Sequence, residues 1–271
     1  MSQDTPQHEI TKMKVVFDMP GTDAVTVRAD VEFHAADGGV LAMDLYYPSG
    51  ATSGSRLPAV VVVLGYSDVG VHKMLGCKFK EIASSVSWGR LIAASGMVAI
   101  TYTNREPQGD LRALAAHLRQ NAASLGIDEN RIGIWSSSGN VPVALSMLMQ
   151  AGADEVRCAV LCYGYMLDLD GATGVADAAA QFRFVNAAAG KSVDDLPTNL
   201  PLFVVRAGQE QFPHLNDAID AFVPKALTRN LPVTCVNHPD GPHAFDLFHD
   251  SEATREIIRQ ILRFMQFHLQ A

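Results

Sequence analysis

The pattern of hydrophobic and polar positions changes character at residue 57. Before it, the stretches 24–34 (AVTVRADVEFH) and 40–48 (VLAMDLYYP) alternate apolar and polar residues, as strands with one buried face do. The turn-forming letters ADGG separate them, which predicts an antiparallel hairpin. From residue 57 onward the apolar runs are continuous and rich in β-branched residues. Such runs are typical of strands buried on both faces, in a parallel sheet that helices cover.

Strand-like and helix-like patterns alternate along the rest of the chain. Runs of the strand type lie at 57–65, 97–104, 131–135, 158–165, 201–208 and 233–239. Helical patterns lie at 109–126, 141–150, 214–229 and 251–269. The alternation predicts an α/β fold, in which a mostly parallel central sheet carries helices on both faces and the N-terminal hairpin forms an antiparallel edge.

Two segments fall outside this alternation. The first 11 residues are polar, and we expect a loose tail there. Residues 167–198 are rich in Ala and Asp with weak periodicity. A segment of that length without a clear element, inside a compact domain, is typical of a small insertion or lid. The length of 271 residues otherwise fits one domain, 1–271.

Composition narrows the classes of function. The 21 basic and 29 acidic residues give a net charge of −8, which argues against binding to nucleic acid or to anionic membranes. We find neither an apolar run long enough to span a bilayer nor a secretory signal, so we expect a cytoplasmic protein. The four cysteines lack CxxC spacing, which favours buried free thiols over disulfides; Cys158 and Cys162 as metal ligands are the less favoured reading.

Three consecutive serines lie between a strand and a helix, in the stretch GIWSSSGNVP at 133–142. In a G-x-S-x-G elbow the nucleophile sits on a strained strand-to-helix turn, so the residues two before and two after it must be small. Ser136 would be flanked by Ile134, and Ser137 by Trp135, both too large. Ser138 would be flanked by Ser136 and Asn140, so sterics favour Ser138.

The stretch LGIDENRIGIWSSSGNVPVAL resembles the α/β-hydrolase pattern LGID-x-x-RI-x-W-G-x-S-x-G-G. In that pattern the nucleophile follows the tryptophan by three residues, which again indicates Ser138. The chain departs from the pattern because Ser136 and Asn140 replace the two glycines. The resemblance, to serine esterases and dienelactone-hydrolase-like members, covers most of the chain from about residue 30 and implies an α/β-hydrolase fold.

A serine nucleophile needs a histidine base and an acid that orients it, and in this fold they follow in the order Ser, Asp or Glu, His. Of the nine histidines, His243 lies on a Pro/Gly-rich loop between the last strand and the last helix, in HPDGPHAFD. That loop resembles the G-x-x-H-x-F loop of the related esterases. The family also places its acid two residues after the glycine that ends a late strand, which implies Glu210. The alternatives for the acid are Asp217, Asp220 and Asp240.

The oxyanion hole requires two backbone N–H donors. Gly139, directly after Ser138, is expected to supply one, and the family position in the loop LGYSDVG implies Tyr66 for the other. Arg105 follows a strand end; a surface ion pair with Glu106 or a neighbour is favoured over a substrate carboxylate. Phe182 and Phe184 either line an acyl pocket or, as we favour, anchor the 167–198 segment.

Together these features imply a serine hydrolase that cleaves a small carboxylic ester through an acyl-enzyme, with neither metal nor organic cofactor. The expected partner is a small-molecule ester, with no nucleic acid and no membrane. Two alternatives stay open: a hydrolase-fold binding protein without activity, motivated by the replaced glycines, and an acyltransferase that uses the same three residues. The sequence leaves assembly into a homo-oligomer open.

Overall fold

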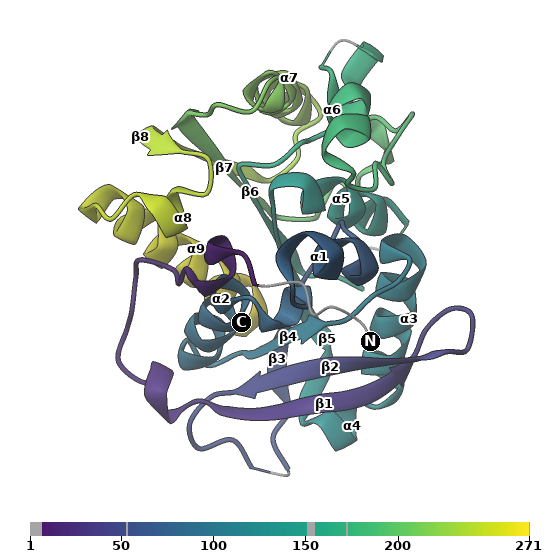
Figure 1. Cartoon of the computed structure of the whole chain (residues 1–271), viewed down its shortest axis with the longest axis vertical. Helices are drawn as coiled ribbons and strands as arrows, with labels where there is room; N and C mark the ends of the chain where they lie inside the picture. Colours follow the sequence, from purple (N-terminus) through teal and green to yellow (C-terminus); the bar gives the residue numbers. More distant parts are fainter. Residues whose placement is uncertain (1–6, 53, 151–154, 172, 271) are drawn as a thin grey trace.

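The computed structural model describes residues 7–52, 54–150, 155–171 and 173–270. These residues contain one eight-stranded sheet in the order β1-β2-β4-β3-β5-β6-β7-β8 (Figure 1). The strands are β1 (Thr26–His34), β2 (Val40–Tyr47), β3 (Leu57–Val62), β4 (Val98–Tyr102), β5 (Ile127–Ser137), β6 (Cys158–Cys162), β7 (Leu202–Gln209) and β8 (Val233–Pro242). The β1–β2 hairpin and the β2–β4 pair are antiparallel. All pairs from β4 to β8 are parallel, which confirms the predicted sheet.

Helices cover both faces of the sheet. They are α1 (Asp68–Leu75), α2 (Ala83–Ala94), α3 (Pro107–Gln120), α4 (Ala122–Leu125), α5 (Val141–Gln150), α6 (Val175–Phe182), α7 (Leu215–Thr228), α8 (Phe245–Phe248) and α9 (Glu252–Gln270). One core cluster joins the sheet to α3, α5 and α7, and a second joins the opposite face to α2 and α9. Strand β3 contributes to both clusters because successive side chains point to opposite faces of the sheet. Val61 belongs to the first cluster, whereas Val60 and Val62 belong to the second. No helix among the described residues has the length and apolarity needed to cross a bilayer.

Several elements differ from those that the pattern predicts. Helices α1 and α2 lie in a stretch where we predicted none. In α2 the residues Trp88, Leu91 and Ile92 are buried, whereas Gly89 and three serines weaken the helical signal, so packing rather than propensity stabilises this helix. The predicted helix 109–126 is two helices, α3 and α4. Strands β5 and β8 are longer than predicted and β6 is shorter, because pairing with neighbours decides where a strand ends.

Residues 167–198 contain α6 and two 3-10 turns, and they pack on the core rather than standing apart. Phe184 is 5% exposed and stacks on Tyr165 with ring centroids 5.0 Å apart. The Val185 N–H also donates a hydrogen bond to the Gly65 carbonyl at 2.8 Å. These contacts tie the segment to the loop that follows β3.

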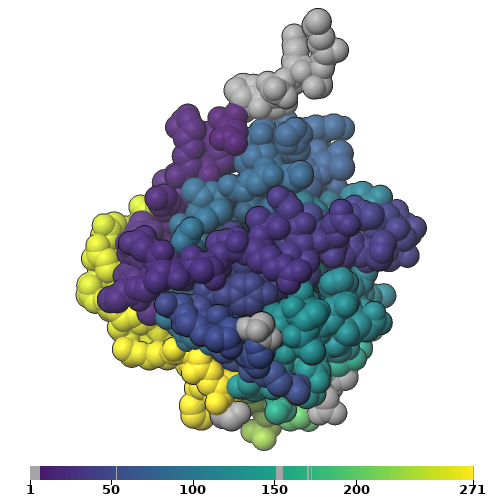
Figure 2. Space-filling model, turned by 90° about the horizontal axis from the view of Figure 1, so that it is seen from below, coloured from purple at the N-terminus to yellow at the C-terminus, as the bar shows by residue number. Residues whose placement is uncertain are grey.

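Of the expected N-terminal tail, residues 1–6 lie outside the described residues. Residues 9–12 form a 3-10 turn, and the His8 N–H donates to the Leu75 carbonyl of α1 at 3.0 Å. Figure 2 shows the hairpin in purple crossing the lower face, with the N-terminal segment above it beside the blue residues of α1 and α2. The segment from His8 is therefore part of the folded structure.

Candidate active site

Each of four neighbouring parallel strands is followed directly by a residue of the candidate site. Strand β5 ends at Ser137 and precedes Ser138; β6 ends at Cys162 and precedes Tyr163. Strand β7 ends at Gln209 and precedes Glu210, and β8 ends at Pro242 and precedes His243. Because the carboxyl ends of parallel strands meet at one edge of the sheet, these residues converge there.

Ser138 occupies a strained turn between β5 and α5. Its φ is 55°, in the left-handed region that residues other than glycine seldom adopt. Its Oγ lies 2.9 Å from His243 Nε2. Ser136, by contrast, is fully buried, and its hydroxyl has no hydrogen-bond partner among the described residues. Of the three serines, Ser138 is the one that the structure places against the imidazole.

The loop after β3 packs closely against Asn140, which replaces the second of the two elbow glycines. A Cβ atom on Gly65 would lie 2.4 Å from the Gly139 carbonyl oxygen and 2.7 Å from Asn140 Cα, so only glycine fits there without displacing the elbow. The Gly65 N–H also donates to Asn140 Oδ1 at 2.7 Å. In this chain the close backbone approach is thus provided by Gly65, and the asparagine fixes it with a hydrogen bond.

Glu210 holds the other ring nitrogen of His243. Glu210 Oε2 lies 2.7 Å from His243 Nδ1, and the Glu210 side chain is 1% exposed. Its other oxygen, Oε1, accepts the backbone N–H groups of Gln211 and Phe212, each at 2.9 Å. The Gln211 side chain in turn accepts the His243 backbone N–H at 3.2 Å. The carboxylate is therefore held in position by its own loop as well as by the imidazole.

The three alternative acids do not contact His243 in the described hydrogen-bond network. Asp217 pairs with His214 at 3.1 Å, and Asp220 pairs with Arg206 at 2.7 Å. Asp240 lies exposed on β8. The geometry therefore favours Glu210 among the candidates that the sequence left open.

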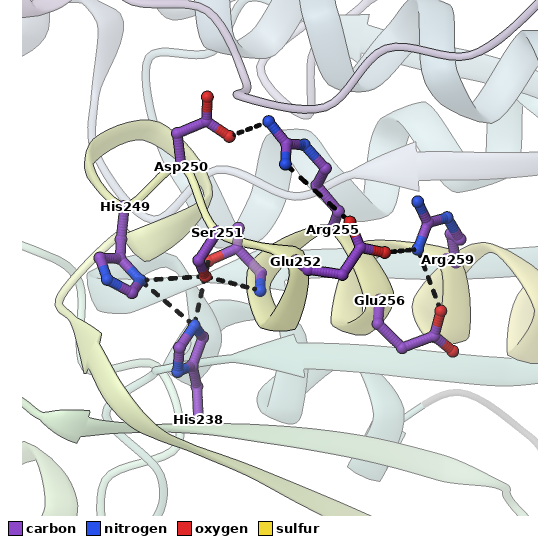
Figure 3. A network of polar contacts seen from close by, with 9 residues as sticks. His238, His249, Asp250, Ser251, Glu252, Arg255, Glu256 and Arg259 are labelled. Atoms are coloured by element: carbon purple, nitrogen blue, oxygen red, sulfur yellow. Dashed lines mark hydrogen bonds and ion pairs between the residues drawn. The ribbon is translucent and has the colours of Figure 1, made fainter.

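A second histidine cluster anchors the chain just beyond His243. His238 is 1% exposed, and its Nε2 lies 3.0 Å from Thr254 Oγ1 and 3.4 Å from His249 Nδ1. Ser251 joins this cluster through His249 and Thr254 (Figure 3). The contacts connect β8 to the start of α9, on either side of the short α8, and so fix both ends of the segment that contains His243.

The Tyr66 N–H takes part in none of the hydrogen bonds described for loops and turns, and Gly139 lies in the 3-10 turn Ser138–Asn140 that precedes α5. Gly139 follows Ser138 directly, and Tyr66 follows Gly65 in the loop that touches the elbow. The structure thus places both expected donors beside Ser138.

Two cavities meet at Ser138. The larger, of about 550 Å³, extends between the N-terminal 3-10 turn, α2 and α8, with a mostly apolar and aromatic lining that includes Trp88, Trp135 and Phe248. The smaller, of about 240 Å³, lies towards α1 and α6 and is lined by Val71, Met74 and Phe182 among others. Ser138 and Tyr66 line both cavities, so Ser138 lies where two largely apolar spaces meet.

The wall of the larger cavity contains a buried carboxyl group that was not predicted from the sequence. Asp246 is 3% exposed; it accepts hydrogen bonds from Tyr163 Oη at 2.6 Å and from Trp88 Nε1 at 2.8 Å. Burial raises the pKa of the Asp246 carboxyl, while these two hydrogen bonds oppose the rise. The Tyr163 ring lies edge-on to the His243 ring, with centroids 5.2 Å apart. The position of Asp246 three residues after His243, in HAFD, is the only signal that the sequence offers.

Other residues singled out from the sequence lie away from this site. Arg105 forms an ion pair with Asp37 in the hairpin turn, not with Glu106. Cys158 and Cys162 are buried free thiols, whereas Cys235 is exposed. Within the described ranges there is no group of three or more His, Cys, Asp or Glu side chains arranged to hold a metal ion. Phe182 lines the smaller cavity, and Phe184 packs in the core.

Comparison with solved structures identifies the fold. No protein-family model and no curated protein matches the chain. Among solved structures, a bacterial heroin esterase is similar over 94% of this chain and 88% of its own, with 15% identity and a TM-score of 0.72. An esterase of Rhizomucor miehei matches over 95% and 86%, with 16% identity and a TM-score of 0.71. An esterase of Pyrobaculum calidifontis matches over 89% and 85%, with 21% identity and a TM-score of 0.65. The chain therefore has the α/β-hydrolase fold.

Proposed function

We propose that the protein is a serine esterase that hydrolyses small, uncharged carboxylic esters through an acyl-enzyme. The contact chain Ser138 Oγ–His243 Nε2 and His243 Nδ1–Glu210 Oε2, at 2.9 and 2.7 Å, carries the proposal. A hydroxyl, an imidazole and a carboxylate in this order are the arrangement that activates a serine nucleophile. Solved esterases of the same fold support the reaction class.

In the proposed mechanism Ser138 Oγ attacks the ester carbonyl carbon while its proton passes to His243 Nε2. The carbonyl π electrons move onto oxygen, and the N–H groups of Gly139 and Tyr66 stabilise that oxyanion. When the tetrahedral intermediate collapses, the ester C–O bond breaks and the leaving alkoxide takes the proton from the imidazolium. Water then repeats the sequence on the acyl-enzyme, releasing the acid and restoring Ser138. Glu210 holds the imidazole with its Nδ1–H towards the carboxylate throughout.

The two cavities at Ser138 suggest which esters fit. We assign one arm of the ester, acyl or alkyl, to the cavity of about 550 Å³ and the other to the cavity of about 240 Å³. The described residues of both linings include no lysine or arginine, so a carboxylate on the substrate would find no ionic partner. An uncharged ester with two apolar arms of unequal size is therefore the preferred substrate.

A fluorophosphonate probe followed by peptide mass spectrometry tests the proposal, because such probes react with a serine that a base activates. We expect a label on Ser138 and hydrolysis of p-nitrophenyl esters by the unmodified protein. Ser138→Ala should abolish both. Ser136→Ala is the matched control and should keep both, since Ser136 is buried and lies outside the cavity linings.

The outcomes separate the candidate functions. A label on Ser137 would retain the chemistry but overturn the assignment of Ser138. A folded protein without any label would favour a binding protein that has the hydrolase fold. A labelled protein that transfers its acyl group to an added alcohol faster than to water would indicate an acyltransferase.

A further inference from the structure

The Tyr66 side chain lies beside the residue that follows the nucleophile. A Cβ atom on Gly139 would lie 2.4 Å from Tyr66 Oη, so the hydroxyl group occupies the space that any larger residue at 139 would fill. The Gly139 N–H is one of the two expected oxyanion donors, and the oxyanion must form next to it. The Tyr66 hydroxyl is thus close to the place where negative charge develops.

The Tyr66 hydroxyl is available as a donor. Among the described side-chain hydrogen bonds, none involves Tyr66 Oη, although the side chain is largely enclosed. Other enclosed tyrosines use their hydroxyls: Tyr102 Oη accepts the Leu64 N–H, and Tyr163 Oη donates to Asp246. Burial raises the pKa of Tyr66 to about 12, which keeps its O–H protonated near neutral pH.

The ring that carries this hydroxyl is held in place. It contacts the edge of Phe184, with centroids 6.3 Å apart and an interplanar angle of 71°. Phe184 is itself buried against Tyr165, and the next residue, Val185, is hydrogen-bonded to Gly65. A donor fixed by such packing costs little reorganisation when charge develops, which is the condition for effective oxyanion stabilisation.

We propose that the Tyr66 side-chain hydroxyl donates a hydrogen bond to the oxyanion of the tetrahedral intermediate, alongside the Gly139 N–H. The inference rests on the esterase function proposed above and adds a catalytic group to it. The hydroxyl keeps its proton throughout: it forms no covalent bond, and the only proton that moves travels between Ser138, His243 and the leaving group. The role belongs to the side chain, so it is separable from that of the Tyr66 backbone N–H.

Tyr66→Phe separates the role of the side-chain hydroxyl from that of the backbone N–H, because it removes the hydroxyl and keeps both the ring and the backbone amide. We expect kcat for p-nitrophenyl butyrate to fall by ~10²–10³-fold, the size of effect that follows loss of one oxyanion donor, with KM changed less than ~3-fold. Tyr47→Phe is the control: it deletes a hydroxyl that donates to the Leu125 carbonyl, outside both cavities, and should leave kcat unchanged.

A second measurement ties the loss to the oxyanion rather than to packing. A trifluoromethyl ketone forms a tetrahedral adduct with an active serine, and its inhibition constant should weaken in Tyr66→Phe by a factor similar to the loss in kcat/KM. A kcat within ~3-fold of the unmodified enzyme would show that backbone amides alone bind the oxyanion and would overturn the proposal.

The unmodified enzyme provides a test that does not depend on the variant folding. In a crystal structure of its phosphonate adduct, Tyr66 Oη should lie within hydrogen-bond distance of the phosphonyl oxygen. A hydroxyl turned away from that oxygen would also overturn the proposal. Failure of the esterase function would look different, since the unmodified protein would then neither take the label nor hydrolyse the ester.

Discussion

Replacing Glu210 with glutamine tests the carboxylate with little disturbance of the fold. Because Oε1 of Glu210 accepts two backbone N–H groups, a glutamine amide oxygen can keep both contacts. The amide NH2 group then faces His243 Nδ1, at the site of the present 2.7 Å contact. Two N–H donors cannot share that contact, so the imidazole must carry its proton on Nε2. In that tautomer Nε2 cannot accept the proton of Ser138.

The expected loss of kcat in Glu210→Gln follows from this wrong tautomer of His243. In serine proteases, the matching acid-to-amide change leaves the geometry intact and lowers kcat by about 10⁴. The Glu210 side chain is also buried, at 1% exposure, so we expect a loss of kcat of similar order. We expect kcat to fall by ~10³–10⁴, which corresponds to ~4–5.5 kcal/mol of transition-state stabilisation.

The assay is steady-state hydrolysis of p-nitrophenyl butyrate, with thermal unfolding measured in parallel. Asn237→Asp serves as a control on β8, since it changes charge on an exposed position outside both cavities and should leave kcat unchanged. If Glu210→Gln keeps kcat within tenfold while its midpoint of unfolding is unchanged, Glu210 does not orient His243, and Asp217 or Asp240 becomes the acid to test.

Two further predictions concern the elbow and the second histidine cluster. Gly65→Ala should lower kcat by ~10² or more and destabilise the fold by ~1–3 kcal/mol, because the alanine Cβ would lie 2.4 Å from the Gly139 carbonyl oxygen and displace the elbow. Steady-state kinetics and urea unfolding measure the two effects. A variant as active and as stable as the unmodified protein would refute the prediction. Burial, with the neighbouring charge of His249, lowers the pKa of His238 below its ordinary 6.5, so the unfolded chain binds the proton first. The contribution of neutral His238 to the free energy of unfolding is therefore complete above pH ~6.5, and it is lost as the pH falls towards the pKa of His238 in the folded protein. The midpoint of thermal unfolding, measured between pH 5 and 8, should fall as the pH is lowered, and it should fall less steeply in His238→Asn than in the unmodified protein. An equal pH dependence in the two proteins would show that His238 is not the group responsible.

Much of the candidate site was predictable because it follows from local order along the chain. Apolar runs marked the strands, and Ser138, Glu210 and His243 directly follow three of the strands in the structure. The local pattern and the α/β-hydrolase resemblance together indicated Ser138 and His243, whereas the resemblance alone implied Glu210. Parallel strands in one sheet must end at one edge, so a strand pattern also predicts which side chains converge. The choice of Ser138 among three serines followed from the small neighbours that a strained turn requires.

The choice among the candidate acids needed the tertiary structure. Glu210, Asp217 and Asp240 lie within 30 positions of one another, and spacing alone left more than one of them open as the acid. Hydrogen bonding distinguishes them in the folded chain, where Glu210 meets Nδ1 while Asp217 meets His214. The same holds for Gly65 and Asn140: their contact joins residues 75 positions apart, and no local pattern encodes it.

Helices α1 and α2, the cavities and the neighbourhood of Tyr66 also depended on tertiary packing. Glycine and serine lower the helical propensity of α2, and the contacts of Trp88 and Leu91 with distant residues compensate. The sequence by itself determined the periodicity of each segment and the chemistry of its side chains, because both are local. Which side chains meet, which polar groups are enclosed and where the chain leaves cavities were decided only when the sheet brought distant segments together.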